Sequence, residues 1–272
     1  MDMHIVIFTD LDGTLLSYDN CSFEEALDAL EVIKQKRIPL VLCSSKTRSE
    51  IELYRERLAN TDPFVSENGG GIYIPDGYFT KSPDVGVRQD NGYRVITLGK
   101  RYSELRDGLG RLREMGFRVK GFGDMTVEEV ASITGLSPEE AKLSKEREFD
   151  EPFIMEDGAD EERLRDAVLS LELNFTVGRH YHLMGESNKG KAVRILTELY
   201  RKEFGDIRTI AMGDSPNDIP MLEAVDIPVL VQKPGGIYDS RIVIPKLVRA
   251  EGVGPDGWRK VIMKLVGNFQ DK

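Results

Sequence analysis

The chain has 272 residues, of which 40% are hydrophobic, so it can bury a sizeable core in one large domain or two modest ones. Its formal net charge is −10, which repels phosphate backbones and anionic lipid, so we expect neither a nucleic-acid nor a membrane partner. No apolar run approaches the roughly 20 residues of a spanning helix, and we expect a cytoplasmic protein. The two cysteines, Cys21 and Cys43, lack a spacing that would indicate a disulfide or a zinc site.

The first quarter of the chain alternates short apolar runs with amphipathic stretches, a pattern typical of βαβ units on a parallel sheet. The same alternation returns after residue 186. Apolar runs predict strands over residues 4–8, 39–43, 63–67, 207–213 and 227–231. Apolar residues at helical spacing predict helices over residues 23–33, 51–58, 188–204 and 257–269. Together the two segments predict an α/β core with a Rossmann-like parallel sheet.

The middle of the chain has a different order of elements. The predicted strands there are 93–98, 117–122, 152–156 and 175–184. The predicted helices are 103–115 and 160–172, with two shorter ones near 126–134 and 138–147. Without the two shorter helices the order is β-α-β-β-α-β, which fits a separate small α+β domain. We therefore expect a core of residues 1–82 and 186–272, with an inserted domain at 83–185.

Two aspartates, Asp10 and Asp12, follow the first predicted strand in 5-IVIFTDLDGTLL-16. Open α/β sheets bind their ligands in the crevice beyond the carboxyl ends of the strands, so we expect both carboxylates there. Two like charges this close destabilise each other unless a cation or a shared proton is present. Mg²⁺ is the candidate cation, because it binds carboxylates together with phosphate oxygens. The alternative is a solvated turn, since Asp-Gly is a common turn dipeptide.

A second acidic cluster ends another predicted strand, in 209-TIAMGDSPNDIPML-222. Asp214 and Asp218 flank Asn217 there, again after an apolar run that ends in glycine. Two acidic strand ends in one sheet favour a shared metal site over the turn interpretation.

These motifs resemble those of the haloacid-dehalogenase superfamily of phosphatases. That family's first motif, DxDGT, is matched by 10-DLDGT-14, and its second, a Ser or Thr that ends the next strand, by Ser44. Its third, a Lys that opens a later helix, is matched by Lys189, and its fourth, GDxxND, by 213-GDSPND-218. Taken alone, Ser44 fits a helix N-cap and Lys189 a solvated helix residue. The ordered set of four motifs favours the family.

The resemblance implies a covalent mechanism. Asp10 would attack phosphorus and form an aspartyl-phosphate, while Asp12 would protonate the departing alcohol and then deprotonate the hydrolytic water. Ser44 and Lys189 would bind the transferring phosphoryl oxygens. The residues that would hold Mg²⁺ are Asp10, Asp12 through its backbone carbonyl, Asp214 and Asp218, the last as a ligand or as a support for one.

The inserted domain falls between the second and third motifs, which is the position of the larger type of cap in this superfamily. In this respect the chain resembles the Cof-like branch of sugar-phosphate phosphatases. Such a cap would close over the site, exclude water and supply specificity. Within that branch five stretches resemble phosphatases of mannosyl-3-phosphoglycerate: 41-VLCSSKT-47, 66-SENGG-70, 133-ITGLS-137, 178-GRHYHL-183 and 251-EGVGPDGW-258. His180 departs from that pattern, where we expect an aromatic residue.

The implied substrate carries a phosphate, a glyceric carboxylate and a mannosyl group, and its hydrolysis would supply mannosylglycerate, a compatible solute. Alternation along 175–184 puts Arg179 on one face with Tyr181, and His180 and His182 on the other. We expect Arg179 to bind the carboxylate, since guanidinium pairs bidentately with carboxylate, and a structural ion pair is the alternative. The other candidate substrate-binding residues are Ser45, Lys46, Glu67, Asn68, His182 and Asn217.

A basic cluster, Lys142, Lys145 and Arg147, lies in the predicted cap. Glutamates alternate with these residues, which predicts a salt-bridged solvent face rather than a binding site.

Three alternative functions stay open at this level. The first is a phosphatase for glucosyl-3-phosphoglycerate or a hexose phosphate, and the second is a phosphomutase. The third is a catalytically inactive binding protein. Inactive relatives usually lack at least one motif residue, whereas this chain has the full set of Asp10, Asp12, Ser44, Lys189 and Asp214.

Overall fold

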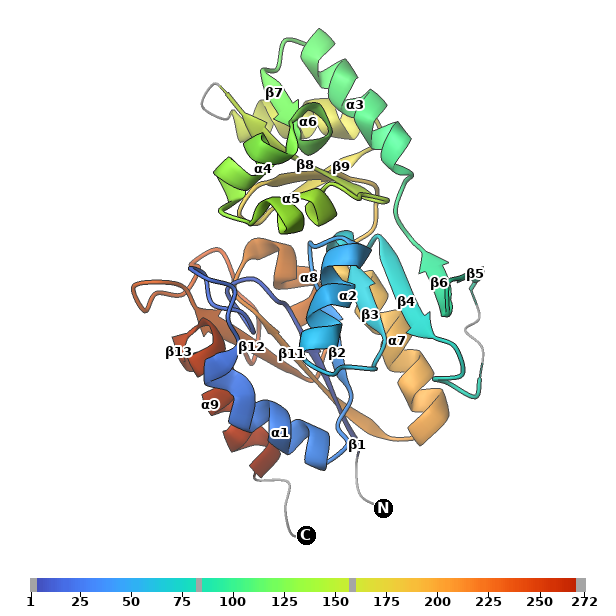
Figure 1. Ribbon diagram of the computed structural model, residues 1–272, viewed down its shortest axis with the longest axis vertical. Coiled ribbons are helices and arrows are strands. Elements are labelled where there is room, and N and C mark those ends of the chain that lie inside the picture. Colours follow the sequence, from blue (N-terminus) through green and yellow to red (C-terminus); the bar gives the residue numbers. More distant parts are fainter. Residues whose placement is uncertain (1–3, 82–84, 157–159, 268–272) are drawn as a thin grey trace.

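The computed structural model describes residues 4–81, 85–156 and 160–267. Within these ranges nine strands form one large sheet in the order β13-β12-β11-β1-β2-β3-β4-β6-β5, and four form a second sheet in the order β7-β8-β10-β9. The two sheets belong to two units stacked along the long axis of the molecule (Figure 1). The predicted α/β core with a second, smaller α+β unit is confirmed. No helix in the described ranges is long and apolar enough to cross a membrane.

The large sheet places β1 at its centre, paired in parallel with β2 and with β11. Its strands are β1 His4–Thr9, β2 Leu40–Cys43, β3 Phe64–Ser66, β4 Gly71–Pro75, β5 Arg88–Asp90, β6 Tyr93–Thr97, β11 Ile207–Gly213, β12 Ile227–Gln232 and β13 Val248–Val253. Pairing is parallel from β13 to β3 and antiparallel from β3 to β5. The carboxyl ends of β1, β2 and β11 therefore meet at one edge of the sheet, where ligands bind in this type of fold.

Helices cover both faces of the large sheet: α1 Leu27–Gln35, α2 Arg48–Arg57, α7 Lys189–Phe204, α8 Ile219–Leu222 and α9 Gly254–Gly267. Alternate residues of β1 divide between two hydrophobic cores. Ile5 and Ile7 lie in the core that contains Trp258 of α9, whereas Val6 and Phe8 lie in the core that contains Leu196 of α7. A strand that is buried on both faces needs a continuous apolar run, and residues 5–8 supply it.

The second sheet is antiparallel and consists of β7 Val119–Gly121, β8 Asp150–Met155, β9 Asn174–Val177 and β10 Tyr181–Met184. Helices α3 Tyr102–Glu114 and α6 Glu161–Ser170 pack on it through Leu109 and Leu164, which share one hydrophobic core with Phe153. Two shorter helices, α4 Val127–Thr134 and α5 Pro138–Ser144, lie between this sheet and the large unit (Figure 1). Helix α5 contacts α2 of the core, where Thr47 Oγ1 donates to the Leu143 carbonyl at 3.0 Å.

One strand that we expected in the inserted unit belongs to the large sheet instead. Residues 93–98 were predicted to open the β-α-β-β-α-β order, but β6 pairs with β4, with Tyr73 opposite Val95. Its Tyr93 ring meets the rings of Phe64 and Tyr73 edge-on, at 5.5 and 6.0 Å between centroids. These aromatic contacts bury the strand against the core, which periodicity alone does not reveal.

The strand predicted over residues 175–184 is two strands, β9 and β10, which form an antiparallel hairpin. The turn between them is closed by a hydrogen bond from Gly178 N to the His180 carbonyl, 3.0 Å long. A continuous alternation of faces through Arg179 and His180 is therefore wrong, because both residues lie at the turn.

The predicted domain boundary at 82/83 lies outside the described residues, as does the end of the closing helix at 268–269. At the other boundary, β10 ends at Met184 and α7 begins at Lys189, on either side of 185/186. We retain the division into a core and an inserted cap as a proposal, with β5 and β6 paired to the core sheet.

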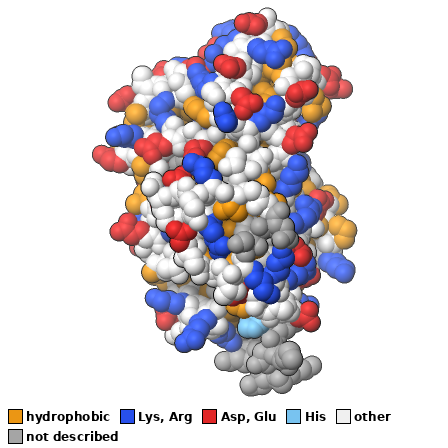
Figure 2. Space-filling model, turned by 90° about the vertical axis from the view of Figure 1, so that its right-hand side faces the viewer, with side chains coloured by type: hydrophobic (Ala, Val, Ile, Leu, Met, Phe, Trp, Pro, Cys, Tyr) orange, Lys and Arg blue, Asp and Glu red, His pale blue; other side chains and the backbone are white. Residues whose placement is uncertain are grey.

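Acidic and basic side chains are interspersed over the face of the molecule shown in Figure 2, and the hydrophobic ones are scattered among them. The net charge of −10 is therefore not gathered into one acidic patch on that face.

Candidate active site

Asp10 and Asp12 lie just beyond the carboxyl end of β1. Asp10 is buried, and its backbone N–H donates to the Met212 carbonyl of β11 at 2.9 Å. The Asp12 side chain is 46% exposed. Gly13 turns the chain behind them with φ +77°, and a Cβ there would lie 2.5 Å from the Tyr18 ring and 3.0 Å from Asp214 Oδ2. Only glycine fits this turn, which brings the loop after β1 close to the end of β11.

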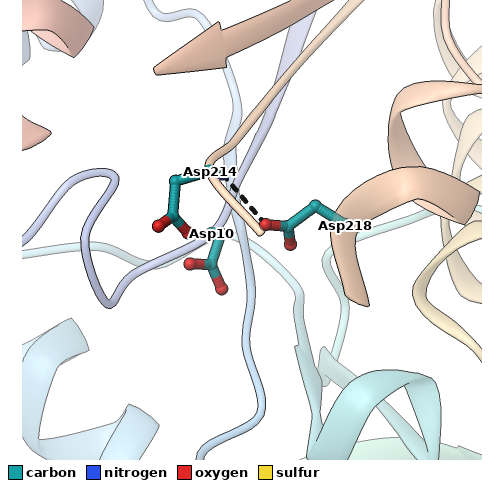
Figure 3. Close-up of side chains that lie close together, drawn as sticks. All are labelled: Asp10, Asp214 and Asp218. Carbon is teal, nitrogen blue, oxygen red and sulfur yellow. Dashed lines mark hydrogen bonds between the residues drawn. The ribbon is translucent and has the colours of Figure 1, made fainter. Parts of the chain in front are cut away.

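The second predicted acidic cluster lies beside the first. Asp214 directly follows β11, and Asp218 ends a short 3-10 turn at Pro216–Asp218. One carboxylate oxygen from each of Asp10, Asp214 and Asp218 lies within 4.8 Å of the others (Figure 3). Asp218 Oδ2 accepts hydrogen bonds from the backbone N–H groups of Asp214, at 3.0 Å, and Ser215, at 3.1 Å. The tertiary fold thus brings the two acidic strand ends together.

Lys189 is the first residue of α7 and is fully buried, so it is not a solvated helix residue. Its Nζ donates to Asp10 Oδ1 and to Asp218 Oδ1, both at 2.7 Å. The turn after β3 holds this helix start in place: Gly69 has φ +94°, and a Cβ there would lie 2.3 Å from the backbone of Asn188. One ammonium group therefore sits against two of the three clustered carboxylates.

Negative charge exceeds positive charge in this cluster. Burial raises the pKa of Asp10 well above its ordinary value; Lys189 opposes the shift, whereas Asp218 and Asp214 add to it. Burial, followed by the neighbouring Asp218, raises the pKa of Asp214 to about 7. Burial alone would lower the pKa of Lys189, but Asp10 and Asp218 outweigh it and raise that pKa, so the lysine stays charged.

The acidic cluster fits a divalent cation. Asp214 Oδ2 is buried, and no hydrogen-bond donor reaches it from the described part of the chain. Carboxylate oxygens are the ligands that Mg²⁺ prefers, and a bound cation would relieve the repulsion that raises the pKa of Asp10 and Asp214. Both oxygens of Asp218 already accept hydrogen bonds, from Lys189 and from two amides, which favours a supporting role for it.

We expect Asp214 to contribute stability to the metal-free protein that is lost as the pH rises from about 4 to about 7, whereas His180, with its lowered pKa, contributes the opposite slope. The native pKa of Asp214, about 7, lies above that of the unfolded chain, so the native state binds the proton more tightly and its advantage is lost as that proton leaves. Melting temperatures in a chelator across this pH range, with and without added Mg²⁺, test it. Asp214→Asn should gain stability with rising pH relative to the unchanged protein, and the same pH dependence in both proteins would contradict this assignment.

Ser44 directly follows β2 and is buried, but it does not cap the following helix. Thr47 is the N-cap of α2, in a capping box with Glu50. Ser44 Oγ accepts instead from the Lys46 backbone N–H at 3.2 Å, and the Ser44 carbonyl accepts from Asn68 N at 3.0 Å. The N-cap alternative for Ser44 is therefore excluded, and its hydroxyl lies at the carboxyl end of the strand next to β1.

A pocket between the core and the inserted unit opens onto Asp10, Asp12 and Asp214. From the core, Ser45, Lys46 and Asn217 line it as well, and from the inserted unit it is lined by Arg147, Arg179, His180 and His182. Burial, followed by His182 and Arg179, lowers the pKa of His180 to about 4, which leaves its ring neutral at physiological pH. Arg179, His180 and His182 all line this pocket, although alternation along a single strand had placed Arg179 on the opposite face from the two histidines.

Arg179 links the inserted unit to the core loop after β1. Its Nη1 donates to the Thr134 carbonyl and its Nη2 to the Tyr18 carbonyl, both at 3.1 Å. Its guanidinium also stacks over the Tyr18 ring, 5.2 Å from the ring centroid. The partners of Arg179 among the described residues are thus two backbone carbonyls and an aromatic ring, so its contacts are structural but are not the ion pair that we gave as the alternative.

Four predicted substrate-binding residues belong to hydrogen-bond networks across the two units. Asn217 Nδ2 donates to Asn68 Oδ1 at 3.1 Å, and Asn68 Nδ2 donates to Asp150 Oδ2 at 2.9 Å. His182 Nδ1 shares the same Asp150 oxygen at 2.8 Å. The buried Glu67 carboxylate accepts from the backbone N–H groups of residues 148–150 at 2.7 to 3.1 Å. Of these four, Asn217 and His182 line the pocket, whereas Glu67 and Asn68 hold the inserted unit on the core.

Two residues of this interface, Arg147 and Asp150, were not predicted to lie there from the sequence. Arg147 was expected on a solvent face, but its side chain is 4% exposed. Its Nη1 donates to the Ser45 carbonyl at 2.7 Å and to Asp150 Oδ1 at 3.0 Å. A hydrophobic neighbour, Phe149, was the only local signal that this charged segment turns inward.

The comparisons with known proteins agree with this geometry. A family model for haloacid dehalogenase-like hydrolases matches residues 7–83 and 127–233. A Methanococcoides burtonii protein named glucosyl-3-phosphoglycerate/mannosyl-3-phosphoglycerate phosphatase is 47% identical over 97% of this chain and 98% of its own length. A Pyrococcus horikoshii mannosyl-3-phosphoglycerate phosphatase is 39% identical over 81% of this chain and 88% of its own length.

A crystal structure of a Thermoplasma acidophilum protein aligns with a TM-score of 0.70 at 18% identity, over 97% of this chain and 99% of that one. That likeness supports the fold, while the family model and the sequence relatives show the family. The chain therefore belongs to the haloacid dehalogenase-like hydrolase family, as its four motifs predicted.

Proposed function

We propose that this protein is a Mg²⁺-dependent phosphatase that hydrolyses mannosyl-3-phosphoglycerate to mannosylglycerate and phosphate through an aspartyl-phosphate. It is a phosphoric monoester hydrolase. The observation that carries the mechanism is the contact of the buried Lys189 with Asp10, next to Asp214, at the floor of a pocket that the inserted unit covers.

Asp10 is the nucleophile in this proposal. Its carboxylate attacks phosphorus, the bond from phosphorus to the ester oxygen breaks, and that oxygen takes a proton from Asp12. Water then attacks the aspartyl-phosphate, gives its proton to Asp12, and releases inorganic phosphate together with the free Asp10 carboxylate. Asp12 suits the proton transfers because its half-exposed side chain lines the pocket, whereas Asp10 is buried.

Lys189 and Ser44 bind the phosphoryl oxygens in this proposal, and Lys189 also lowers the repulsion between an anionic nucleophile and an anionic substrate. Mg²⁺, held by Asp10, Asp214 and the Asp12 carbonyl, supplies charge neutralisation at the phosphoryl group when bound. The inserted unit covers the pocket and excludes water from the reacting atoms.

The sugar phosphoglycerate is favoured as substrate by two observations. Relatives that match 97% and 81% of the chain carry that substrate in their names, and the first of those names includes the glucosyl as well as the mannosyl ester. The pocket also combines cationic side chains, Lys46 and Arg147, with the neutral ring of His180, as a substrate with a carboxylate and sugar hydroxyls requires. The glucosyl ester is the second candidate.

Phosphate release from a substrate panel tests this proposal. We expect kcat/KM on mannosyl- and glucosyl-3-phosphoglycerate to exceed that on mannose 6-phosphate and glucose 6-phosphate by at least about a hundredfold, because the simple esters lack the carboxylate. Equal rates on hexose phosphates would overturn the substrate assignment. Isomerised sugar phosphate without released phosphate would indicate a phosphomutase, and no turnover of any ester would indicate a binding protein.

A further inference from the structure

We infer that Lys46, rather than Arg179, selects the substrate by binding a carboxylate of the leaving group. In such a substrate the carboxylate is attached to the carbon next to the one that carries the phosphate ester. The inference rests on the proposed function, in which Asp12 protonates the ester oxygen. It assigns a specificity-determining residue and predicts which class of phosphate ester the pocket accepts.

The position of Lys46 is fixed by its neighbours. The residue is 6% exposed, lines the pocket, and follows Ser44 and Ser45, which come directly after β2. Its Nζ lies 3.0 Å from Asp12 Oδ1 and 3.7 Å from Glu50 Oε1. Burial alone would lower the pKa of Lys46, but Asp12 and Glu50 outweigh it and raise that pKa, so the group in the pocket is an ammonium.

Asp12 sets the distance between this ammonium and the leaving group. A proton donor must lie about 2.6–3.2 Å from the ester oxygen that it protonates, and Lys46 Nζ is 3.0 Å from the same carboxylate. In an ester of the 3-hydroxyl of glycerate, the carboxylate oxygens lie roughly 3–5 Å from the ester oxygen, by ordinary bond lengths. A glyceric carboxylate therefore comes within hydrogen-bond reach of Lys46 when its ester oxygen meets Asp12.

The ammonium has the capacity for this third partner. It carries three N–H donors, and in the described residues it contacts the carboxylates of Asp12 and Glu50 and lies 5.5 Å from the centroid of the Tyr54 ring, which accepts no conventional hydrogen bond. Glu50 is held in place independently, since its Oε2 accepts from Thr47 N at 2.9 Å in the capping box of α2. A substrate carboxylate can bind without displacing either protein partner.

Arg179 is less suited to the carboxylate, although we expected it there. Its two terminal nitrogens donate to the carbonyls of Thr134 and Tyr18, and its plane lies over the Tyr18 ring. The bond to the Tyr18 carbonyl joins the inserted unit to the core, and the bond to Thr134 fixes the guanidinium within the inserted unit, so its N–H donors that remain are held in an orientation set by these contacts. We assign Arg179 the role of a positioning residue.

Two ligands that differ in one group isolate the carboxylate: 3-phosphoglycerate and glycerol 3-phosphate, which has a hydroxymethyl group in its place. Their inhibition constants are measured against hydrolysis of p-nitrophenyl phosphate, with Mg²⁺ in excess. For the wild-type protein we expect 3-phosphoglycerate to bind about tenfold to a hundredfold more tightly, the range of a charge-assisted hydrogen bond. Lys46→Met should bring the two constants within about twofold of each other.

The ratio of the two constants, rather than the absolute rate, is the readout, because Lys46 also contacts Asp12. Arg179→Met is the matched control and should retain the wild-type ratio, as should Lys46→Arg to a large extent. If Lys46→Met is too slow to assay, calorimetric titration of both ligands into the same variant gives the ratio directly. A ratio that survives in Lys46→Met, or that is lost in Arg179→Met alone, would overturn the inference.

This result is separable from a failure of the proposed function. A wild-type protein that hydrolyses no sugar phosphoglycerate refutes the proposed substrate in the panel assay. The inference about Lys46 fails only in the comparison of the two glycerol-derived ligands, which is made with a different reporter substrate.

Discussion

Replacing Asp10 by asparagine is expected to lower phosphate release by at least about 10⁴-fold, because the amide cannot attack phosphorus and no aspartyl-phosphate forms. The fold should survive, since Asn keeps the shape of the side chain and removes a buried charge whose pKa is already raised well above its ordinary value. Phosphate release on mannosyl-3-phosphoglycerate, a melting curve and the mass of the acid-quenched protein are the measurements. A rate near that of the wild type would refute the covalent route.

Asp12→Asn is the matched control for this experiment. We expect a fall of about 10²–10⁴-fold on the sugar ester, with a smaller fall on p-nitrophenyl phosphate, whose leaving group needs little protonation. The phosphorylated protein should accumulate, because the variant retains its nucleophile and lacks the base that activates water. Accumulation in Asp12→Asn and none in Asp10→Asn would separate the two roles, and the reverse would exchange them.

Lys189→Met is expected to abolish activity and to destabilise the metal-free protein by about 3–5 kcal/mol, because it removes the cation from a buried group of carboxylates. Both of its partners, Asp10 and Asp218, are 2.7 Å from the lost ammonium and lie out of water. Denaturant unfolding in a chelator measures the loss. Added Mg²⁺ should restore part of the stability but not the activity, since the cation offsets the repulsion without contacting phosphate as Lys189 does.

Lys191→Met is the control for charge removal from the same helix turn. Lys191 is exposed, and its Nζ donates to the Glu186 carbonyl at 2.6 Å. Its replacement should change the free energy of unfolding by no more than about 0.5 kcal/mol and leave kcat unchanged. Equal losses in the two variants would mean that the buried carboxylates do not depend on Lys189.

Much of the fold was predictable because its signals are local. Residues 5–8 are apolar without interruption since the strand is covered on both faces, and α7 begins within one residue of its predicted start. The sequence-based predictions failed where contacts between distant segments decide the structure. Residues 93–97 have the same pattern in either sheet, and their pairing with β4, together with the packing of Tyr93 on Phe64 and Tyr73, assigns them to the core. Gly178 turns the chain between β9 and β10, where the alternation of apolar residues predicted one strand.

The sequence by itself determined the family, because the order of its four motifs can be read without coordinates, and it predicted the catalytic set of Asp10, Asp12, Ser44, Lys189 and Asp214. The tertiary structure alone decided which side chains of the inserted unit meet the site. Charged residues such as Arg147 and Lys46 look the same in a sequence whether solvated or buried; their burial depends on partners from the other unit or from a distant loop. Pairing across the two units is not a property of either segment, so it could be found only in three dimensions.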